Sequence, residues 1–251
     1  MSGHSKWSTI KHKKAATDAK RGRVWSKVSR DITVAAKRGG GDSESNPRLR
    51  LAVDKARAAN MPKDNIEKAI KKGTGELEGE AFEEVLYEGY GPNGVAVMVQ
   101  ALTDNRARTA PEIKKLFERK GGNLGPSNCV AWMFVQRGVI VVNHEDADED
   151  RLLEIVLEHG AEDVSTSERI FEVRCDPSSF EKVRDGLRQA GIPIESADLS
   201  MVAENNVVLD LEAARKVLDL VESLEEHDDV QAVSANFDIP DNVLTRLDAE
   251  R

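Results

Sequence analysis

The first thirty residues of the chain carry nine cationic side chains and a single acidic one, Asp18. Lysine and arginine attract phosphate groups, and an aromatic ring between them can stack on a base or a sugar. Trp7 and His12 lie among the cations. The pattern predicts a nucleic-acid contact whose affinity falls with salt. The cations are Lys6, Lys11, Lys13, Lys14, Lys20, Arg21, Arg23, Lys27 and Arg30.

Charge is distributed unevenly along the 251 residues. Residues 1–72 contain 12 Lys and 7 Arg against 5 Asp and 2 Glu, a formal charge of +12, so that the remainder carries −21 of the total of −9. Such a run of charge is often only a solvated face. Here the cations lack acidic partners at helical i,i+4 spacing. A basic head on an acidic body therefore predicts a polyanionic partner for the head.

Three amphipathic segments position these cations. The first begins at a cap, Thr17, and ends at the glycines of 39–41; the second begins at Asn46-Pro47. The third covers residues 63–72, and its spacing from the second is typical of a helix-turn-helix. We expect a basic helical domain over residues 1–76. The third helix has two interpretations. It is an ordinary helix of the bundle, or it recognises a groove of DNA.

Beyond residue 76 the hydrophobic period changes to that of strands, and we expect a hairpin over 84–102 and a helix over 109–120. Residues 138–202 read as a βαββαβ unit, and a helix over 211–226 and a strand over 230–237 follow. The sequence thus predicts a multidomain α+β protein. Its three-helix domain precedes two ferredoxin-like-type α/β domains. One of them is split between residues 77–137 and 203–251, and the other, residues 138–202, is inserted in it.

Two further motifs in the body have a chemical and a structural interpretation. Arg106 and Arg108 follow the second strand of the hairpin, and we expect a capped helix start with exposed arginines, with an anion contact there as the alternative. GYGPNG at 89–94 matches GxGxxG, but a strand follows it where a dinucleotide site needs a helix. We interpret this motif as a hairpin turn.

The sequence offers no signature of an enzyme, metal site or membrane protein. The five histidines have no metal spacing, and Cys129 and Cys175 form no CxxC pair. We therefore expect no catalytic centre, no metal and no cofactor. The absence of a long apolar run and of a disulfide framework predicts a cytoplasmic location without membrane contact. The sequence leaves the oligomeric state open.

Several motifs together resemble those of the YebC family. GPSNCVAWMF at 125–134 is a looser version of the family's stretch at that place. The matching motifs are GHSKW (3–7), KHKKAATDAKRGRVWSK (11–27), NMPKDNIEKAIKKG (60–73), YEGYGPNGVAVMV (87–99), TDNRART (103–109) and KGGNLG (120–125).

The resemblance implies a three-domain cytoplasmic protein that acts in gene expression without a catalytic centre. Members of the family are labelled transcriptional regulators, and mitochondrial relatives are translational activators. We expect binding to ribosomal RNA, and action on the ribosome in translation, ahead of binding to promoter DNA. An enzyme with scattered carboxylates and a protein scaffold are the remaining alternatives.

Overall fold

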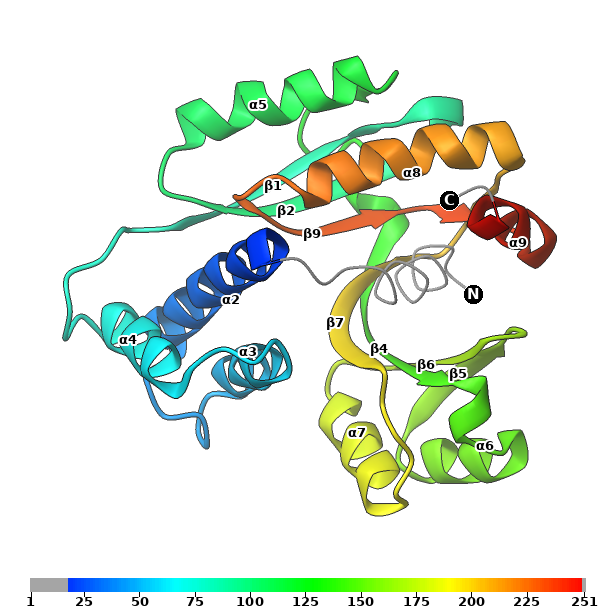
Figure 1. The fold of residues 1–251 in the computed structure, drawn as a ribbon, viewed down its shortest axis with the longest axis horizontal. Coiled ribbons are helices and arrows are strands. Elements are labelled where there is room, and N and C mark those ends of the chain that lie inside the picture. The colour runs from blue at the N-terminus through cyan, green and yellow to red at the C-terminus, as the bar shows by residue number, and fades with distance from the viewer. Residues whose placement is uncertain (1–17, 250–251) are drawn as a thin grey trace.

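The computed structural model describes residues 18–249 and has an α+β fold with an N-terminal three-helix unit and two antiparallel sheets. Figure 1 shows the three helices on one side of the molecule, beside two layers that each contain one sheet. The upper layer holds the first sheet beneath two helices, and the lower layer holds the second sheet. This arrangement confirms the predicted fold class.

The helical unit consists of α2 (Asp18–Gly39), α3 (Pro47–Ala58) and α4 (Lys63–Thr74). Asn46 caps α3 as expected, because its side-chain oxygen accepts from the amide of Leu49 at 3.1 Å. The same side chain donates to the carbonyls of Ala35 and Gly40 at the end of α2. One buried asparagine thus fixes the corner between two helices. The expected cap at Thr17 lies outside the described residues.

α4 crosses α2 closely at Gly73. A Cβ atom there would lie 2.4 Å from the carbonyl oxygen of Thr33, so a larger residue would force the helices apart. The core of the unit is small and aliphatic, with Ile32, Leu49 and Ala69 among its buried side chains. The helical period of the sequence predicted these helices within a few residues.

The first sheet has the order β3-β1-β2-β9 and lies under α5 (Arg106–Arg119) and α8 (Leu211–Glu225) (Figure 1). Its strands are β1 (Glu83–Tyr90), β2 (Ala96–Thr103), β3 (Asn123–Leu124) and β9 (Val230–Ala235). β1 and β2 form the predicted hairpin, with Glu83 opposite Thr103. The GYGPNG motif is its turn, in which Asn93 has a φ of 60° and β2 follows directly.

The second sheet has the order β5-β6-β4-β7, and all its neighbouring strands are antiparallel. This is the strand order of a ferredoxin-like βαββαβ unit. Its hydrophobic core lies between the sheet and its two helices. The elements, in chain order, are β4 (Phe134–Asn143), α6 (Glu149–Glu158), β5 (Ala161–Thr166), β6 (Ile170–Cys175), α7 (Phe180–Gln189) and β7 (Ser196–Ala203).

One strand boundary expected from the sequence was wrong. The predicted βαββαβ unit begins at residue 138, but its first strand, β4, begins at Phe134 after a short 3-10 helix, η2 (Ala131–Met133), and runs unbroken through Gly138. Close packing requires a glycine at this position, and the chain makes no turn there. A Cβ atom at Gly138 would lie 2.6 Å from the Cys175 sulfur and 2.7 Å from the ring of Phe180.

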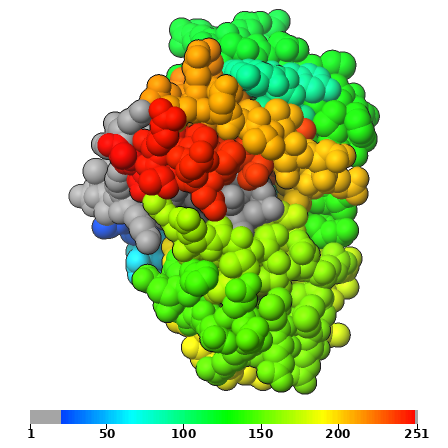
Figure 2. Space-filling model, turned by 90° about the vertical axis from the view of Figure 1, so that its right-hand side faces the viewer, coloured from blue at the N-terminus to red at the C-terminus, as the bar shows by residue number. Residues whose placement is uncertain are grey.

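The C-terminal helix α9 (Asp241–Ala249) was not expected from the sequence. Figure 2 shows α9 between the α8 layer and the second sheet on that face of the molecule. Arg169, at the start of β6, contacts Asp248 of α9 at 3.2 Å. Two short strands, β8 (Val207–Val208) and β10 (Phe237–Asp238), and the 3-10 helix η3 (His144–Asp146) complete the fold. The C-terminal segment therefore bridges the two layers.

Candidate nucleic-acid interface

The structure describes only part of the basic head. Lys20 lies in the first turn of α2, but its side chain is not described. The predictions for the head residues that precede α2 fall outside the described part of the chain. Those residues are Lys6, Trp7, Lys11, His12, Lys13 and Lys14.

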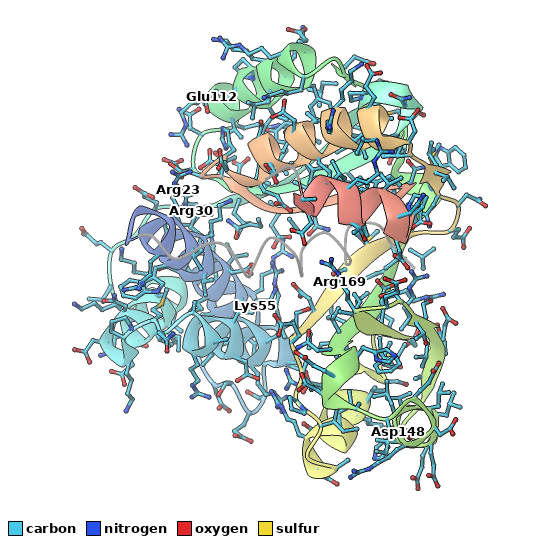
Figure 3. The ribbon with its side chains drawn as sticks, turned by 45° about the vertical axis from the view of Figure 1, so that its right-hand side comes forward. Arg23, Arg30, Lys55, Glu112, Asp148 and Arg169 are labelled. Carbon is cyan, nitrogen blue, oxygen red and sulfur yellow. The ribbon has the colours of Figure 1, made fainter. Side chains whose placement is uncertain are left out.

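The remaining head cations all lie on α2, and they divide into two groups. Arg21 and Arg23 are exposed near the start of the helix. Lys27 and Arg30 are half-buried and face the body of the protein. Figure 3 shows Arg23 and Arg30 at the same end of α2, next to the layer of the first sheet.

Lys27 and Arg30 connect the head to the turn between α8 and β9. The Lys27 ammonium donates to the carbonyl oxygen of Glu225 at 2.5 Å, and Arg30 donates to that of Asp228 at 2.5 Å. Arg30 also pairs with the Asp229 carboxylate at 3.0 Å. These contacts give both cations a structural role. Their contact with nucleic acid stays a prediction.

Asp229 is the centre of this junction, although its side chain is only 3% exposed. Arg108 donates to its second oxygen at 2.8 Å, and the Thr109 hydroxyl donates to that oxygen at 2.6 Å. Three donors from α2 and α5 thus meet on one buried carboxylate. The two arginines and the threonine compensate the buried carboxylate, as buried charge requires.

The charges around Asp229 set its protonation. Burial alone would raise the pKa of this carboxyl, but the hydrogen bonds from Thr109 and Arg108 and the charges of Arg108 and Arg30 outweigh burial and lower the pKa. The carboxylate is therefore ionised at neutral pH, and it holds the helical unit against the first sheet.

The two body arginines lie at a capped helix start, as expected. Asn105 caps α5 by accepting from the Arg108 amide at 3.1 Å. The Arg108 guanidinium is bound by Asp104 and Asp229, at 2.9 and 2.8 Å. Arg106 is exposed in the first turn. Arg108 is therefore part of the junction, and an anion contact at Arg106 stays a prediction.

α4 presents the clearest cationic surface of the described residues. Lys68, Lys71 and Lys72 are exposed, and at 100° per residue they fall within a 100° arc of the helix. Lys37 of α2 is also exposed, and its amide lies next to Gly73 of α4. No ion pair or hydrogen bond engages these ammonium groups within residues 18–249. We call Lys68, Lys71 and Lys72 the lysine face.

The helix that carries the lysine face, α4, does not lie against the body, whereas α3 packs against it. Figure 1 shows α4 on the outer side of α2, and α3 on the side of α7 and β7. Lys55 of α3 pairs with Asp198 of β7 at 2.7 Å, and Asp54 pairs with the buried Arg184 of α7 at 3.3 Å. These ion pairs thus orient the helical unit on the body, and α4 lies on the other side of α2.

A second buried carboxylate organises the turn before β4. Glu88 is 3% exposed, yet its oxygens accept from the amides of Asn128, Val130 and Ala131 at 2.7 to 2.9 Å. Burial raises the pKa of Glu88, but these three amide hydrogen bonds outweigh it and lower the pKa. The ionised side chain therefore holds the backbone of residues 128–131 in one conformation.

The lowered pKa values of the two buried carboxyls, Glu88 and Asp229, predict how these groups make stability depend on pH. A carboxyl whose pKa is lower in the folded state stabilises the fold above its unfolded pKa, and this stabilisation is lost as pH falls through the folded value. The ordinary values are 3.8 for Asp229 and 4.5 for Glu88. We expect a free energy of unfolding that is level above about pH 5 and falls below it by up to about 1.4 kcal/mol per pH unit and group.

Urea unfolding between pH 2.5 and 7 measures this dependence. Burial raises the pKa of Asp31, which therefore contributes in the opposite direction. The variant Glu88→Gln should flatten the acid limb, because it removes one of the titrating groups. An acid limb that is equally steep in Glu88→Gln and in the unmodified protein would contradict the assignment.

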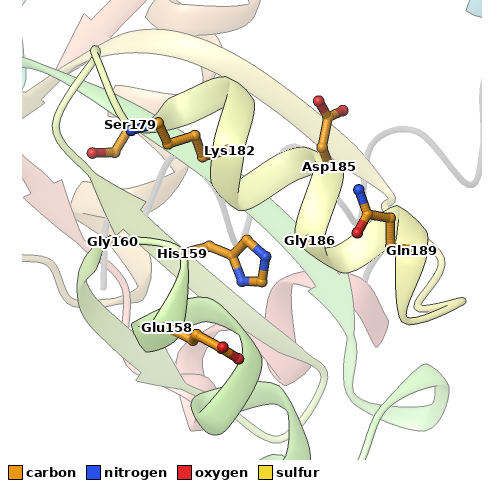
Figure 4. A pocket seen from close by; sticks show the side chains of 8 residues that line it. All are labelled: Glu158, His159, Gly160, Ser179, Lys182, Asp185, Gly186 and Gln189. Atoms are coloured by element: carbon orange, nitrogen blue, oxygen red, sulfur yellow. The ribbon is translucent and has the colours of Figure 1, made fainter.

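A hollow of about 500 Å³ lies between α6 and α7 in the second sheet's layer (Figure 4). Its walls include His159, Ser179 and Lys182. His159 donates from Nδ1 to the carbonyl of Ile155 at 2.7 Å, a local helix-end contact. The two buried carboxylates with lowered pKa values, Glu88 and Asp229, do not line this hollow.

The described residues form neither a cluster of metal ligands nor a membrane-spanning helix. Within residues 18–249, no three His, Cys, Asp or Glu side chains come together as metal ligands would. Over the same part of the chain, no helix has the length and apolar character needed to cross a bilayer.

Two family models match the chain. That of the TACO1/YebC protein N-terminal domain covers residues 5–76, and that of the TACO1/YebC second and third domain covers residues 82–237. A "probable transcriptional regulatory protein" of Dictyoglomus turgidum is 56% identical over 248 residues, 98% of this chain and 100% of the relative. One of the same name from Halothermothrix orenii is 56% identical over 253 residues, covering both chains fully.

A solved structure is also similar over nearly the whole chain. The crystal structure of the conserved hypothetical protein Aq1575 from Aquifex aeolicus superposes with a TM-score of 0.83 at 51% identity. The alignment covers 92% of this chain and 96% of the Aquifex chain.

Proposed function

Because the chain belongs to the TACO1/YebC family, we propose that it is a non-enzymatic regulator of gene expression whose basic helical head binds nucleic acid. The observation that carries the proposal is the lysine face, which is exposed and unpaired within the described residues and lies on α4, the helix on the outer side of α2. We further propose that the body comprises the two predicted domains, 77–137 with 203–251, and 138–202.

Charge and shape support a one-sided contact. More than half of the lysine and arginine residues of the chain lie in residues 1–72, and the rest of the chain has a formal charge of −21. A polyanion is attracted to the basic head and repelled by the acidic remainder of the chain. The ion pairs of Lys55 and Asp54 with β7 and α7 orient α4 outward. A nucleic acid would therefore approach along α4 and the exposed start of α2.

Duplex DNA is the target that we propose first. The two relatives reported above carry the name of transcriptional regulators. α3 and α4 are joined by a short turn at Asn60-Met61-Pro62, as in a helix-turn-helix. The exposed residues of α4 include Asn65, an amide side chain of the type that reads adenine in the major groove.

RNA of the ribosome is the second candidate, and a different observation favours it. Trp7 and His12 alternate with lysines in the sequence ahead of α2. Aromatic rings between cations suit unpaired bases, which are found in folded RNA and not in duplex DNA. Under this alternative the protein acts in translation, and its lysines contact phosphates of ribosomal RNA.

Replacing Lys68, Lys71 and Lys72 together by glutamine should weaken nucleic-acid binding about 100-fold at 50 mM salt. It should also reduce the slope of log affinity against log salt by about 3, because each phosphate contact contributes about one unit. Fluorescence anisotropy with a labelled 30-base-pair DNA and a labelled ribosomal RNA hairpin measures both quantities.

The matched control is the triple variant of Lys114, Lys115 and Lys182 to glutamine, which removes the same charge from exposed positions of the body. It should leave affinity and slope within about twofold of the unmodified protein. Equal losses in both triple variants would indicate a non-specific charge effect and exclude the lysine face as the contact. Tighter binding of the RNA hairpin than of the DNA would favour the second candidate.

A further inference from the structure

Trp132 has the most exposed of the large hydrophobic side chains in the described residues, at 72%. It lies in η2, the 3-10 turn that precedes β4. An indole ring contributes the largest apolar area of any side chain, so leaving it in water forfeits much stabilisation. The packing of the described residues does not require it there, and a binding partner would supply the missing burial.

Hydrogen bonds with side chains of β1 hold the turn that carries Trp132 in one conformation. The carboxylate of Glu88 binds the amides on both sides of Cys129, and the Tyr90 hydroxyl donates to the Cys129 carbonyl at 3.3 Å. The indole N–H of Trp132 donates to the same carbonyl at 3.2 Å. The ring is thus oriented before any partner arrives, which lowers the entropic cost of binding.

The surroundings of Trp132 identify the kind of partner. Residues 121–136 contain no charged side chain, in a chain of which 32% of residues are charged. Ser127 and Asn128 are exposed in the same segment, and Met133 is half-buried. The main chain of Met133 pairs with that of Glu204, an exposed acid. A surface that stacks nucleic-acid bases combines its aromatic rings with cations, and this one has none in the segment.

An aromatic anchor with apolar neighbours in a segment without charged side chains instead has the anatomy of a protein–protein hot spot. We infer that Trp132 anchors a docking surface for an uncharged segment of a partner protein, whose apolar pocket takes the indole ring. This surface is separate from the lysine face in residues and in chemistry. A regulator with both could bind nucleic acid through the head and a protein through the body.

The test begins with the photocrosslinking residue p-benzoylphenylalanine in place of Trp132, in the full-length chain expressed in the cells that make this protein. We expect an adduct that survives nuclease and is lost on protease treatment. The captured protein is then purified, and its affinity for the unmodified chain and for variants is measured by calorimetry. Trp132→Ala should weaken binding about 30-fold or more, and Trp132→Phe should weaken it less.

Val208→Ala is the matched control, because Val208 is also exposed, at 68%, and lies in β8 outside the turn. It should leave the affinity unchanged, and thermal unfolding should show both variants folded. An adduct sensitive to nuclease would assign the surface to nucleic acid, and an adduct of two copies of this chain would assign it to self-association. Either result would overturn the inference. The absence of any adduct, or an affinity of Trp132→Ala for the captured protein equal to that of the unmodified chain, would also overturn it.

Discussion

Glu88→Ala should lower the free energy of unfolding by about 4 kcal/mol, because it leaves the amides of Asn128, Val130 and Ala131 without their acceptor. A hydrogen bond to a charged group contributes about 1.5 to 3 kcal/mol, and a buried donor without a partner carries a desolvation cost. Water that enters beside the smaller side chain would recover part of the loss. Urea unfolding at pH 7 measures the difference.

The matched control for Glu88 is Glu84→Ala. Glu84 lies on the same face of β1, but its carboxylate is 32% exposed and pairs with Arg38 and Arg48 at the surface. Exposed ion pairs contribute about 0 to 1 kcal/mol, so the control should lose at most about 1 kcal/mol. Hydrogen exchange should show lost amide protection at residues 128–131 in Glu88→Ala alone. A loss below 1 kcal/mol in that variant would show that the carboxylate does not support the turn.

Asp229→Ala should destabilise the protein by about 3 kcal/mol, since Arg30, Arg108 and Thr109 all lose their shared acceptor. Removing one member of a buried charge cluster can cost up to about 5 kcal/mol. We reduce that figure because the side chain of Arg108 is 44% exposed and water can solvate it again. Thr109 is fully buried, and its hydroxyl retains contacts with Thr103 and the Asn105 carbonyl.

Asp228→Ala is the control for Asp229. Asp228 is exposed and offers Arg30 only its main-chain carbonyl, which the variant retains. It should change stability by at most about 0.5 kcal/mol. A double-mutant cycle of Asp229→Ala with Arg30→Ala isolates the link between α2 and the first sheet, for which we expect a coupling of about 1 kcal/mol or more. Additive effects would show that this contact does not join the two units.

The sequence predicted the helical unit well because its signals are local. The Asn46-Pro47 cap and the glycines at 39–41 mark ends that short-range chemistry sets. The βαββαβ order of the second sheet also followed from alternating periods. Gly138 misled the prediction, since a glycine that ends a strand and one that makes room for Phe180 look alike in sequence.

The carboxylates at 88 and 229 could not be identified from sequence. Both occur among several acids, and only the fold brings backbone amides or arginines from distant elements to them. The sequence also does not reveal which head cations are exposed and which face the body. Lys27 and Arg30 look like Arg21 and Arg23 in sequence, but one turn of helix separates exposed cations from those that face the body. α9 was overlooked although Pro240 precedes its amphipathic pattern.

Crosslinking in cells tests most directly the claim that the basic head binds nucleic acid. Ultraviolet light is applied to cells that express the full-length chain, and bound DNA and RNA are sequenced while the crosslinked peptides are identified by mass spectrometry. We predict adducts within residues 1–76, including peptides that contain Lys68, Lys71 or Lys72. Adducts confined to residues 77–251, or none above the level of the lysine-face triple variant, would contradict the proposed function.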